Sequence, residues 1–229
     1  MSTDEKIKKQ LVFAGCGGMY HYILGIASVI QKNFVLGPEI IISCSSAGCF
    51  PALLLILDMD IDKMFESWNV PFLQEVYSLR LGALFHWNNI VRKWTLPKLD
   101  DTAFERANSR LYCSLTSFPD FNNHIITDWK SNQDLVDGIM ASGFIPLFDI
   151  CKLTATFRNR RFLDGSITNS SPVPFNNIKS FTIKYNMWRQ IETNWLWIWS
   201  DINWARKLYE LGKEDAMKHI DELSEFFNQ

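Results

Sequence analysis

The sequence predicts a single α/β domain built around a mostly parallel β-sheet. The first 58 residues read as a buried strand, a glycine turn, a helix, a second buried strand, a sharp turn and a second helix. Helical connections between consecutive strands give parallel pairing. The 229 residues fit one domain, and no repeat or Pro/Gly/Ser-rich linker divides them. We therefore expect a polar N-terminal segment at residues 1–9 and one domain over residues 10–229.

Hydrophobic periodicity places the elements of the first part. Residues 11–14 form a short apolar run and predict a strand, and residues 19–31 carry apolar side chains at helical spacing. Residues 39–42 predict a second buried strand. Residues 50–57 predict an apolar helix, with Pro51 in its first turn, where a missing N–H costs nothing.

The rest of the chain continues the same alternation with weaker signals. Alternating runs predict strands, and runs with apolar residues three and four positions apart predict helices. The expected helices are 60–68, 72–84, 134–142 and a terminal amphipathic helix 205–227 with a break at Gly212; the expected strands are 110–116, 124–128, 161–163 and 181–185.

Composition and charge restrict the class of function. Hydrophobic residues make up 47% and charged residues 21% of the chain, as in globular proteins, and the formal net charge is −2. Nucleic-acid binding usually needs a concentrated basic face, so we expect no nucleic-acid partner. A local patch is still compatible with membrane contact.

Cysteine usage and apolar runs indicate the compartment. The five cysteines are scattered, and none of their spacings matches a metal site, so we expect reduced thiols in an intracellular protein and no bound metal. The N-terminus has no apolar signal core. The longest apolar run, about residues 50–57, is too short to span a bilayer. We expect a cytoplasmic protein without a transmembrane segment, either in solution or in peripheral contact with a membrane.

A serine lies in the sharp turn after the second strand. The motif of a nucleophile turn is G-x-S-x-G, and the chain has Cys44-Ser45-Ser46-Ala47-Gly48, with cysteine in place of the first glycine. Such a turn lifts the hydroxyl above the sheet and points helix N–H groups at developing negative charge. Ser46 is therefore the candidate nucleophile. The alternative is a small-residue connection without chemistry.

The first glycine loop has three interpretations. Gly15, Cys16, Gly17 and Gly18 follow the first strand, and backbone N–H groups in such a loop can bind an anion. A dinucleotide loop would need glycine at Tyr20 and an acid after the second strand, and both are missing. An oxyanion hole needs only two or three N–H groups, and we favour it. A simple tight turn is the third interpretation.

A serine nucleophile requires a base, and Asp164 is the best candidate. The four histidines lie outside clear strand ends, so a Ser-His-Asp triad has weak support. Asp164 follows the strand 161–163 and precedes Gly165, where α/β enzymes often place catalytic groups. An ordinary Asp-Gly turn is the alternative.

Taken together, these motifs resemble the patatin-like phospholipase family, and within it the group related to adipose triglyceride lipase. The loop F-A-G-C-G at 13–17 resembles its oxyanion loop, and S-A-G at 46–48 its S-x-G nucleophile motif. The stretch A-S-G-F-I-P-L-F at 141–148 resembles the segment before its catalytic Asp, and D-G-S at 164–166 its D-G-G/A motif. The resemblance covers about residues 10–220, in the family's order.

The resemblance implies a three-layer α/β/α fold and a Ser–Asp dyad that works without histidine. Asp164 would accept the proton of Ser46, and the N–H groups of the loop 15–18 and of Ala47 would hold the oxyanion. An acyl-enzyme would then be released by water, without a metal or an organic cofactor. The implied substrate is a carboxylic ester of a lipid at a membrane or droplet surface.

Three departures from the family pattern leave room for low activity. Cys44 replaces the first glycine of the nucleophile motif, Tyr20 stands where the loop usually has glycine, and Ser166 replaces the second Gly or Ala of the acid motif. We expect a lipid acyl hydrolase, a phospholipase or an acylglycerol lipase. The alternatives are a weak or inactive lipid-binding or scaffold protein of the same fold, and thirdly an acyltransferase or thioesterase.

The tryptophans give one further expectation. Trp195, Trp197 and Trp199 alternate, so one face of a strand there would carry three indoles. Indoles favour membrane interfaces, which suggests an interfacial patch or the wall of an acyl site. Ordinary core packing is the other interpretation.

Overall fold

The central sheet of the computed structural model has the predicted α/β topology. The structure describes residues 7–79, 84–146, 148–149, 152–191 and 201–228. Within them, the strands pair in the order β5-β6-β3-β2-β1-β7, with β4 also paired to β3. The strands are β1 (Lys9–Phe13), β2 (Ile40–Ser45), β3 (Leu111–Ser117), β4 (Asn123–Ile126), β5 (Ala155–Phe157), β6 (Arg160–Leu163) and β7 (Lys179–Ile183).

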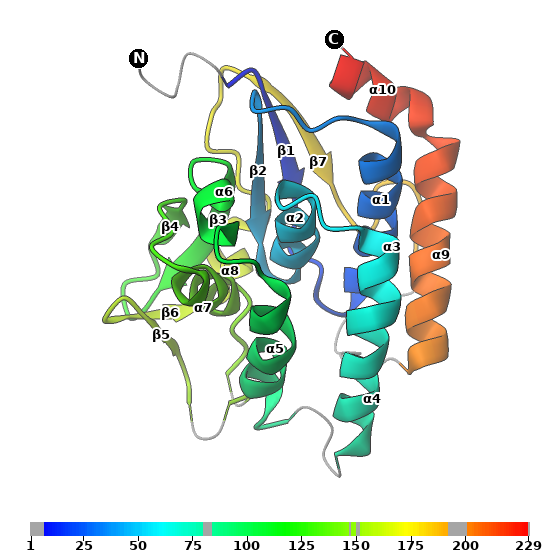
Figure 1. Cartoon of the computed structure of the whole chain (residues 1–229). Coiled ribbons are helices and arrows are strands. Elements are labelled where there is room, and N and C mark those ends of the chain that lie inside the picture. Colours follow the sequence, from blue (N-terminus) through cyan, green and yellow to red (C-terminus); the bar gives the residue numbers. More distant parts are fainter. Residues whose placement is uncertain (1–6, 80–83, 147, 150–151, 192–200, 229) are drawn as a thin grey trace.

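Helices flank this sheet, with α9 running alongside α1 on one side of the molecule (Figure 1). The arrangement confirms the expected α/β class with a central, mostly parallel sheet. The α-helices are α1 (Tyr20–Asn33), α2 (Cys49–Ile56), α3 (Ile61–Met64), α4 (Val70–Ser78), α5 (Trp87–Thr95), α6 (Ala103–Ala107), α7 (Asn132–Ser142), α8 (Ser166–Asn169), α9 (Ile202–Lys218) and α10 (Ile220–Asn228).

The parallel part of the sheet brings two loops together. Strand β1 pairs in parallel with both β2 and β7, and β2 pairs in parallel with β3. Phe13, the last residue of β1, is the register partner of Cys44, the last residue but one of β2. The glycine loop after β1 and the serine turn after β2 therefore leave the sheet side by side.

Strand β6 runs the other way. It pairs antiparallel with β3, with Leu163 opposite Thr116. The chain after Leu163 therefore enters the site from an antiparallel strand, whereas the loops after β1 and β2 come from parallel strand ends. The sequence pattern around Asp164 predicted its strand but not this direction.

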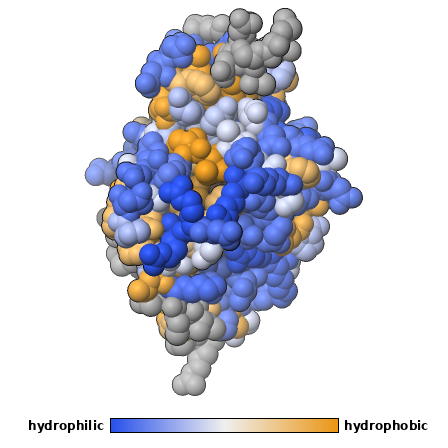
Figure 2. Space-filling view, turned by 90° about the vertical axis from the view of Figure 1, so that its left-hand side faces the viewer, coloured by the Kyte–Doolittle hydropathy of each residue, from blue (hydrophilic) through white to orange (hydrophobic). Residues whose placement is uncertain are grey.

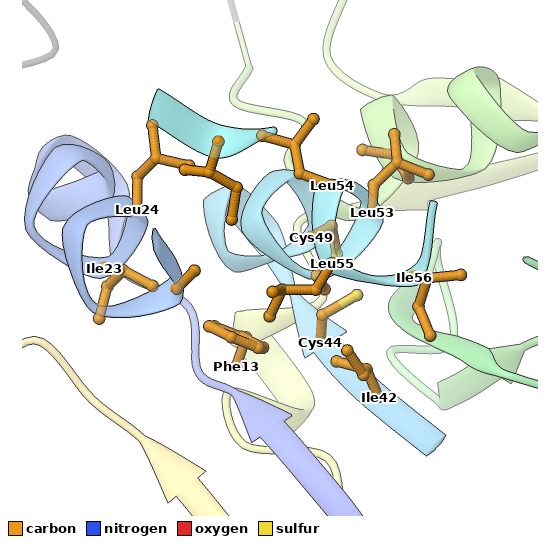
Figure 3. Close-up of a cluster of buried hydrophobic side chains, with 14 of the residues drawn as sticks. Phe13, Ile23, Leu24, Ile42, Cys44, Cys49, Leu53, Leu54, Leu55 and Ile56 are labelled. Atoms are coloured by element: carbon orange, nitrogen blue, oxygen red, sulfur yellow. The ribbon is translucent and has the colours of Figure 1, made fainter. Parts of the chain in front are cut away.

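A continuous hydrophobic core fixes α2 above the first two strands. Figure 3 shows Phe13, Ile42 and Cys44 of the strands facing one side of α2, from which Cys49, Leu55 and Ile56 project. Leu53 and Leu54 project from the other side of α2, and Ile23 and Leu24 of α1 lie beside it. Leu53, Leu54 and Leu55 are each almost fully buried. Because α2 is apolar on nearly every side, its position over the sheet is fixed by burial rather than by one amphipathic stripe.

Glycines allow α1 and α9 to pack with their backbones in contact. A Cβ atom on Gly212 would lie 2.0 Å from the carbonyl oxygen of Tyr22, and one on Gly25 would lie 2.1 Å from that of Tyr209. The expected helix break at Gly212 is therefore wrong, because α9 continues through it to Lys218 and ends before α10 begins. Gly212 serves close packing rather than a turn.

Other expected elements are found with shifted bounds. The helix expected at 60–68 is α3 followed by a π-helical turn, Phe65–Asn69, and the one expected at 72–84 is α4, which begins at Val70 and ends at Ser78. The elements α5, α6, α8 and β5 were not predicted. Three of them, α6, α8 and β5, are too brief to show a period. The tryptophans at 195, 197 and 199 lie outside the described residues.

The face seen in Figure 2 is mostly hydrophilic, with apolar side chains in separate small groups. Among the described residues, no helix is long and apolar enough to cross a membrane. Peripheral membrane contact and a cytoplasmic location stay predictions.

Candidate active site

Ser46 occupies a strained turn between β2 and α2. Ser45 before it is extended, with φ −140° and ψ 143°, and Ser46 itself has φ 54°. A positive φ is uncommon for a residue with a side chain and marks backbone strain held by its surroundings. A 3₁₀ turn over Ser46–Gly48 then leads into α2. This strand–turn–helix geometry is the one in which a serine hydroxyl is presented above a sheet.

Two contacts hold this turn. The backbone N–H of Ser46 donates to the hydroxyl of Ser142, at 2.9 Å, and that hydroxyl donates to the carbonyl of Ser114, at 2.7 Å. A Cβ atom on Gly48 would lie 2.6 Å from the carbonyl oxygen of Ala14. The glycine is therefore needed where the turn passes the end of β1.

Cys44 replaces a glycine without strain. It is the last residue but one of β2, is fully buried and pairs with Cys113 of β3. The positive φ falls two residues later, at Ser46. The position therefore needs a small side chain but not glycine's conformational freedom.

Asp164 contacts the Ser46 hydroxyl directly. The Ser46 Oγ donates to Asp164 Oδ2 at 2.6 Å, and the backbone N–H of Ser166 donates to Asp164 Oδ1 at 2.8 Å. Burial raises the pKa of the Asp164 carboxyl, and these two hydrogen bonds oppose the shift. A Cβ on Gly165 would lie 1.9 Å from the Ser114 carbonyl oxygen, so glycine lets the acid come close to β3.

Ser166 fits a position where a smaller residue was expected. The Ser166 hydroxyl lies 3.0 Å from the Ser45 hydroxyl. A Cβ atom on Gly15 would lie 2.0 Å from the Ser166 hydroxyl oxygen. The glycine of the first loop thus makes room for the hydroxyl. Ser166 joins the serine turn to the acid turn rather than blocking either.

The first loop leaves two glycines at the site. Gly17, with φ 49°, and Gly18 line the same cavity as Ser46 and Ala47. The N–H of Gly15 donates to the carbonyl of Ser170 at 2.9 Å. The Gly15 N–H is therefore already used, and Gly15 is not among the available oxyanion donors, contrary to the expectation from the sequence. Among the described residues, the N–H groups of Gly17, Gly18 and Ala47 have no protein acceptor.

Cys16 is the remaining residue of that loop. Its side chain is buried, and burial raises the pKa of its thiol. Its backbone N–H has no acceptor among the described residues and is the only group of Cys16 that could donate to an anion.

An apolar cavity of about 110 Å³ opens beside Ser46. Of the apolar residues flanking the motifs, Phe50 and Ile145 line it, whereas Leu53 and Phe162 belong to the core. Sequence reasoning missed most of the wall, since these side chains come from α1, α4, α5, α7 and the π-helical turn. The other lining residues are Tyr20, His21, Trp68, Asn69, Phe72, Leu73, Trp87, Val91, Ile139, Met140 and Gly143.

No histidine takes part in the Ser46–Asp164 contact among the described hydrogen bonds. His21 is buried in the cavity wall, and His219 stacks on Trp188 with ring centroids 4.8 Å apart. His219 is packed against this ring while its side chain stays 43% exposed.

The buried thiols gather behind the serine turn. The Sγ atoms of Cys44, Cys49 and Cys113 all lie within 4.8 Å of one another, and the four described cysteines are free. Their sequence spacing gave no sign of this cluster. Burial raises the pKa of the Cys44 and Cys113 thiols, so they act as core side chains in their neutral form.

The sheet brings a serine in a strained turn against a carboxylate, an arrangement in which an adjacent base can activate a serine hydroxyl. Comparison of the chain with protein-family models matches the patatin-like phospholipase model over residues 11–175. The chain belongs to the patatin-like phospholipase family.

Curated relatives agree with this assignment. Human patatin-like phospholipase domain-containing protein 4 is 26% identical over 71% of this chain and 66% of its own length. Human patatin-like phospholipase domain-containing protein 2 is 30% identical over 70% of this chain and 32% of its own length. The mouse 1-acylglycerol-3-phosphate O-acyltransferase Pnpla3 is 25% identical, covering 74% of this chain and 42% of its own length.

The chain thus spans just under two thirds of the first of these relatives and less than half of the other two. A solved structure, VipD from Legionella pneumophila, aligns with a TM-score of 0.48 at 13% identity, over 76% of this chain and 49% of that one.

Proposed function

We propose that the protein is a lipid acyl hydrolase that cleaves carboxylic esters through Ser46 and Asp164. The observation that carries the proposal is the 2.6 Å hydrogen bond from the Ser46 hydroxyl to Asp164 Oδ2, made at a strained turn. A serine is a weak nucleophile at its ordinary pKa and needs an adjacent base. A carboxylate with a raised pKa is a better base at neutral pH than an ordinary one.

The proposed reaction proceeds in two halves. Ser46 Oγ attacks the ester carbonyl as its proton passes to Asp164, and the C–O bond to the alcohol breaks as Asp164 returns the proton to the leaving oxygen. Water then attacks the acyl-enzyme, gives a proton to Asp164, and releases the acid as Ser46 recovers its hydrogen.

The proposed oxyanion donors are the N–H groups of Cys16, Gly17, Gly18 and Ala47. They belong to the loop after β1 and the 3₁₀ turn that starts at Ser46, and three of these four residues line the cavity. Each preorganised donor in such a hole contributes on the order of 3 kcal/mol to transition-state stabilisation.

The cavity favours a lipid ester over a polar one. Phe50, Phe72, Leu73 and Ile145 line it together with other apolar side chains, and burial of an acyl chain there removes apolar surface from water. We propose a glycerophospholipid or an acylglycerol as substrate, reached by peripheral contact with a membrane or droplet surface, in a cytoplasmic protein that needs no metal or cofactor.

Acyl transfer is the second candidate. Two curated relatives are named as transferases, the mouse acyltransferase above and the mouse omega-hydroxyceramide transacylase, which is 25% identical over 75% of this chain. The same acyl-enzyme serves both reactions, and only the acceptor differs. Product analysis with added monoacylglycerol or lysophospholipid distinguishes transfer from hydrolysis.

The direct test is labelling with a fluorescent fluorophosphonate, which reacts with activated serines. We expect the wild type to be labelled, Ser46→Ala to be unlabelled and Asp164→Asn to be labelled at least about a hundredfold more slowly. Ser45→Ala is the matched control, because it removes the neighbouring hydroxyl, and it should keep labelling.

Hydrolysis of phospholipid and acylglycerol micelles by the same four proteins completes the test. Loss of turnover in Ser46→Ala and Asp164→Asn but not in Ser45→Ala supports the dyad. Labelling that survives in Ser46→Ala contradicts the choice of serine. A folded wild type that is neither labelled nor active on micelles would be a lipid-binding protein of this fold.

A further inference from the structure

A small set of polar side chains interrupts the apolar wall of the cavity. Asn69 donates to the Tyr20 hydroxyl at 2.9 Å, and the His21 ring lies edge-on to the Tyr20 ring with centroids 4.9 Å apart. All three residues line the cavity beside Ser46. None of them takes part in the proposed acyl transfer.

His21 is the member of this group whose ring nitrogens have no hydrogen-bond partner among the described residues. It is 5% exposed, and both of its ring nitrogens are buried without a hydrogen-bond partner among the described residues. Burial lowers the pKa of His21 to about 4, so the ring is neutral near pH 7, with one N–H donor and one acceptor nitrogen. A buried polar group without a partner is rare and calls for an explanation.

Asn69 reaches the cavity through an irregular turn. It ends the π-helical turn Phe65–Asn69, which directly precedes α4 and also brings Trp68 to the wall. Single π-helical turns inside helices occur frequently at functional sites. The Tyr20 hydroxyl accepts from Asn69, and its own proton has no acceptor among the described residues. The group therefore offers donors and an acceptor to a ligand.

We propose that Tyr20, His21 and Asn69 form a polar subsite that binds a hydroxyl or keto oxygen carried along the acyl chain of the substrate. The inference rests on the proposed function, since the acyl chain is taken to extend from Ser46 into this cavity. An unsubstituted chain would leave the His21 ring nitrogens and the Tyr20 proton without a partner, whereas one chain oxygen can accept from Tyr20 and pair with His21. Because both ring nitrogens of His21 are buried, the proposed contact requires a turn of the ring about its second side-chain torsion, which has a broad energy minimum.

Binding without turnover tests the subsite separately from the reaction. Calorimetry on Ser46→Ala compares octadecanoic acid with its monohydroxylated derivatives, the hydroxyl being moved stepwise along the chain. We expect at least one hydroxylated acid to bind about tenfold more tightly than the unsubstituted one, as one good buried hydrogen bond gives.

Two conservative variants in the same background locate the effect. Tyr20→Phe and His21→Phe should each reduce this ratio to about twofold or less by weakening the hydroxylated acid. Octadecanoic acid should still bind to both variants, which shows that they fold. Phe72→Leu, on the apolar wall, is the matched control and should weaken both acids while keeping their ratio.

The possible outcomes separate the two proposals. Equal affinity for every hydroxylated acid and octadecanoic acid overturns the subsite, and so does a preference that survives in both Tyr20→Phe and His21→Phe. Hydrolysis by the wild type without any preference defeats the subsite alone. A preference in a protein that hydrolyses no ester defeats the proposed function and leaves the subsite standing.

Discussion

The hydroxyl of Ser142 accepts a hydrogen bond from the backbone N–H of Ser46, at 2.9 Å, and donates one to the carbonyl of Ser114, at 2.7 Å. Ser142 ends α7, and Ser114 belongs to β3. One buried side chain therefore ties the strained turn to the sheet and to a helix that follows it by almost a hundred residues. Its role is to position the proposed nucleophile, not to touch the substrate.

Ser142→Ala should reduce activity by misplacing Ser46. The variant leaves the Ser46 N–H and the Ser114 carbonyl without this partner, and a small displacement of a reacting group costs about a hundredfold in rate. We expect kcat to fall by one to two orders of magnitude with KM nearly unchanged. Ser142→Thr, which keeps the hydroxyl, should recover part of kcat, and wild-type kcat in Ser142→Ala would contradict the positioning role.

The sequence was sufficient for the parts of the site that local rules determine. The turn at Ser46 needs small residues between a buried strand and a helix, and the acid turn needs Gly165, so both appear as short motifs. Ser142 was visible only as part of a resembling stretch. Its hydrogen bonds join positions far apart in the chain, and no periodicity encodes such a contact.

The cavity wall was harder to predict than the contact between Ser46 and Asp164. Tyr20 was visible only as a departure from the loop's usual glycine and His21 only as one of four histidines, and Asn69 gave no signal. The π-helical turn that carries Asn69 does not follow the helical period of 3.6 residues, so the apolar pattern does not reveal it. The direction of β6 was equally hidden, because one strand's sequence does not specify whether its neighbour is parallel.

The positive φ of Ser46 should lower the stability of the folded protein. Its φ of 54° is accessible to glycine with little cost but costs a residue with a Cβ atom about 1 kcal/mol. We expect Ser46→Gly to have a free energy of unfolding about 1 kcal/mol higher than that of Ser46→Ala. Its urea unfolding midpoint should be higher accordingly. Both variants lack the hydroxyl, so equal stability of the two would show that the turn is relaxed.

Asp164→Asn should lower activity without lowering stability. Burial raises the pKa of Asp164 in the folded protein above its unfolded value, so its ionised form at pH 7 opposes folding. Stability from this group is present at low pH and is lost as the pH rises through the raised pKa. We expect the variant to be as stable as the wild type or more stable at pH 7, with the difference shrinking on acidification.

The activity of the wild type should show the same titration. If Asp164 is the base, kcat/KM falls on acidification with a midpoint above the ordinary carboxyl range of about 4. A midpoint at or below that range would argue against Asp164 as the group that accepts the proton of Ser46.

The contact between α1 and α9 should not tolerate a methyl group. Gly25→Ala and Gly212→Ala each place a Cβ about 2 Å from a backbone carbonyl oxygen, which only a shift of a helix can relieve. We expect each to lower the free energy of unfolding by about 2 kcal/mol. Gly37→Ala is the control, since its Cβ would meet only the end of the Glu39 side chain. If all three variants lowered the free energy of unfolding equally, the close contact between α1 and α9 would not be the cause.

His21 should make the folded state sensitive to acid. Its pKa of about 4 in the folded protein lies below the ordinary value of about 6.5, so the unfolded chain takes up a proton over this interval and the folded chain does not. The contribution of His21 to stability is complete above pH 6.5 and is lost as the pH falls toward 4, by up to about 3 kcal/mol. His21→Phe removes the titration, so its free energy of unfolding should decrease less than that of the wild type between these pH values. If the curves of wild type and His21→Phe run parallel, His21 has a partner in solution that the fold alone does not provide.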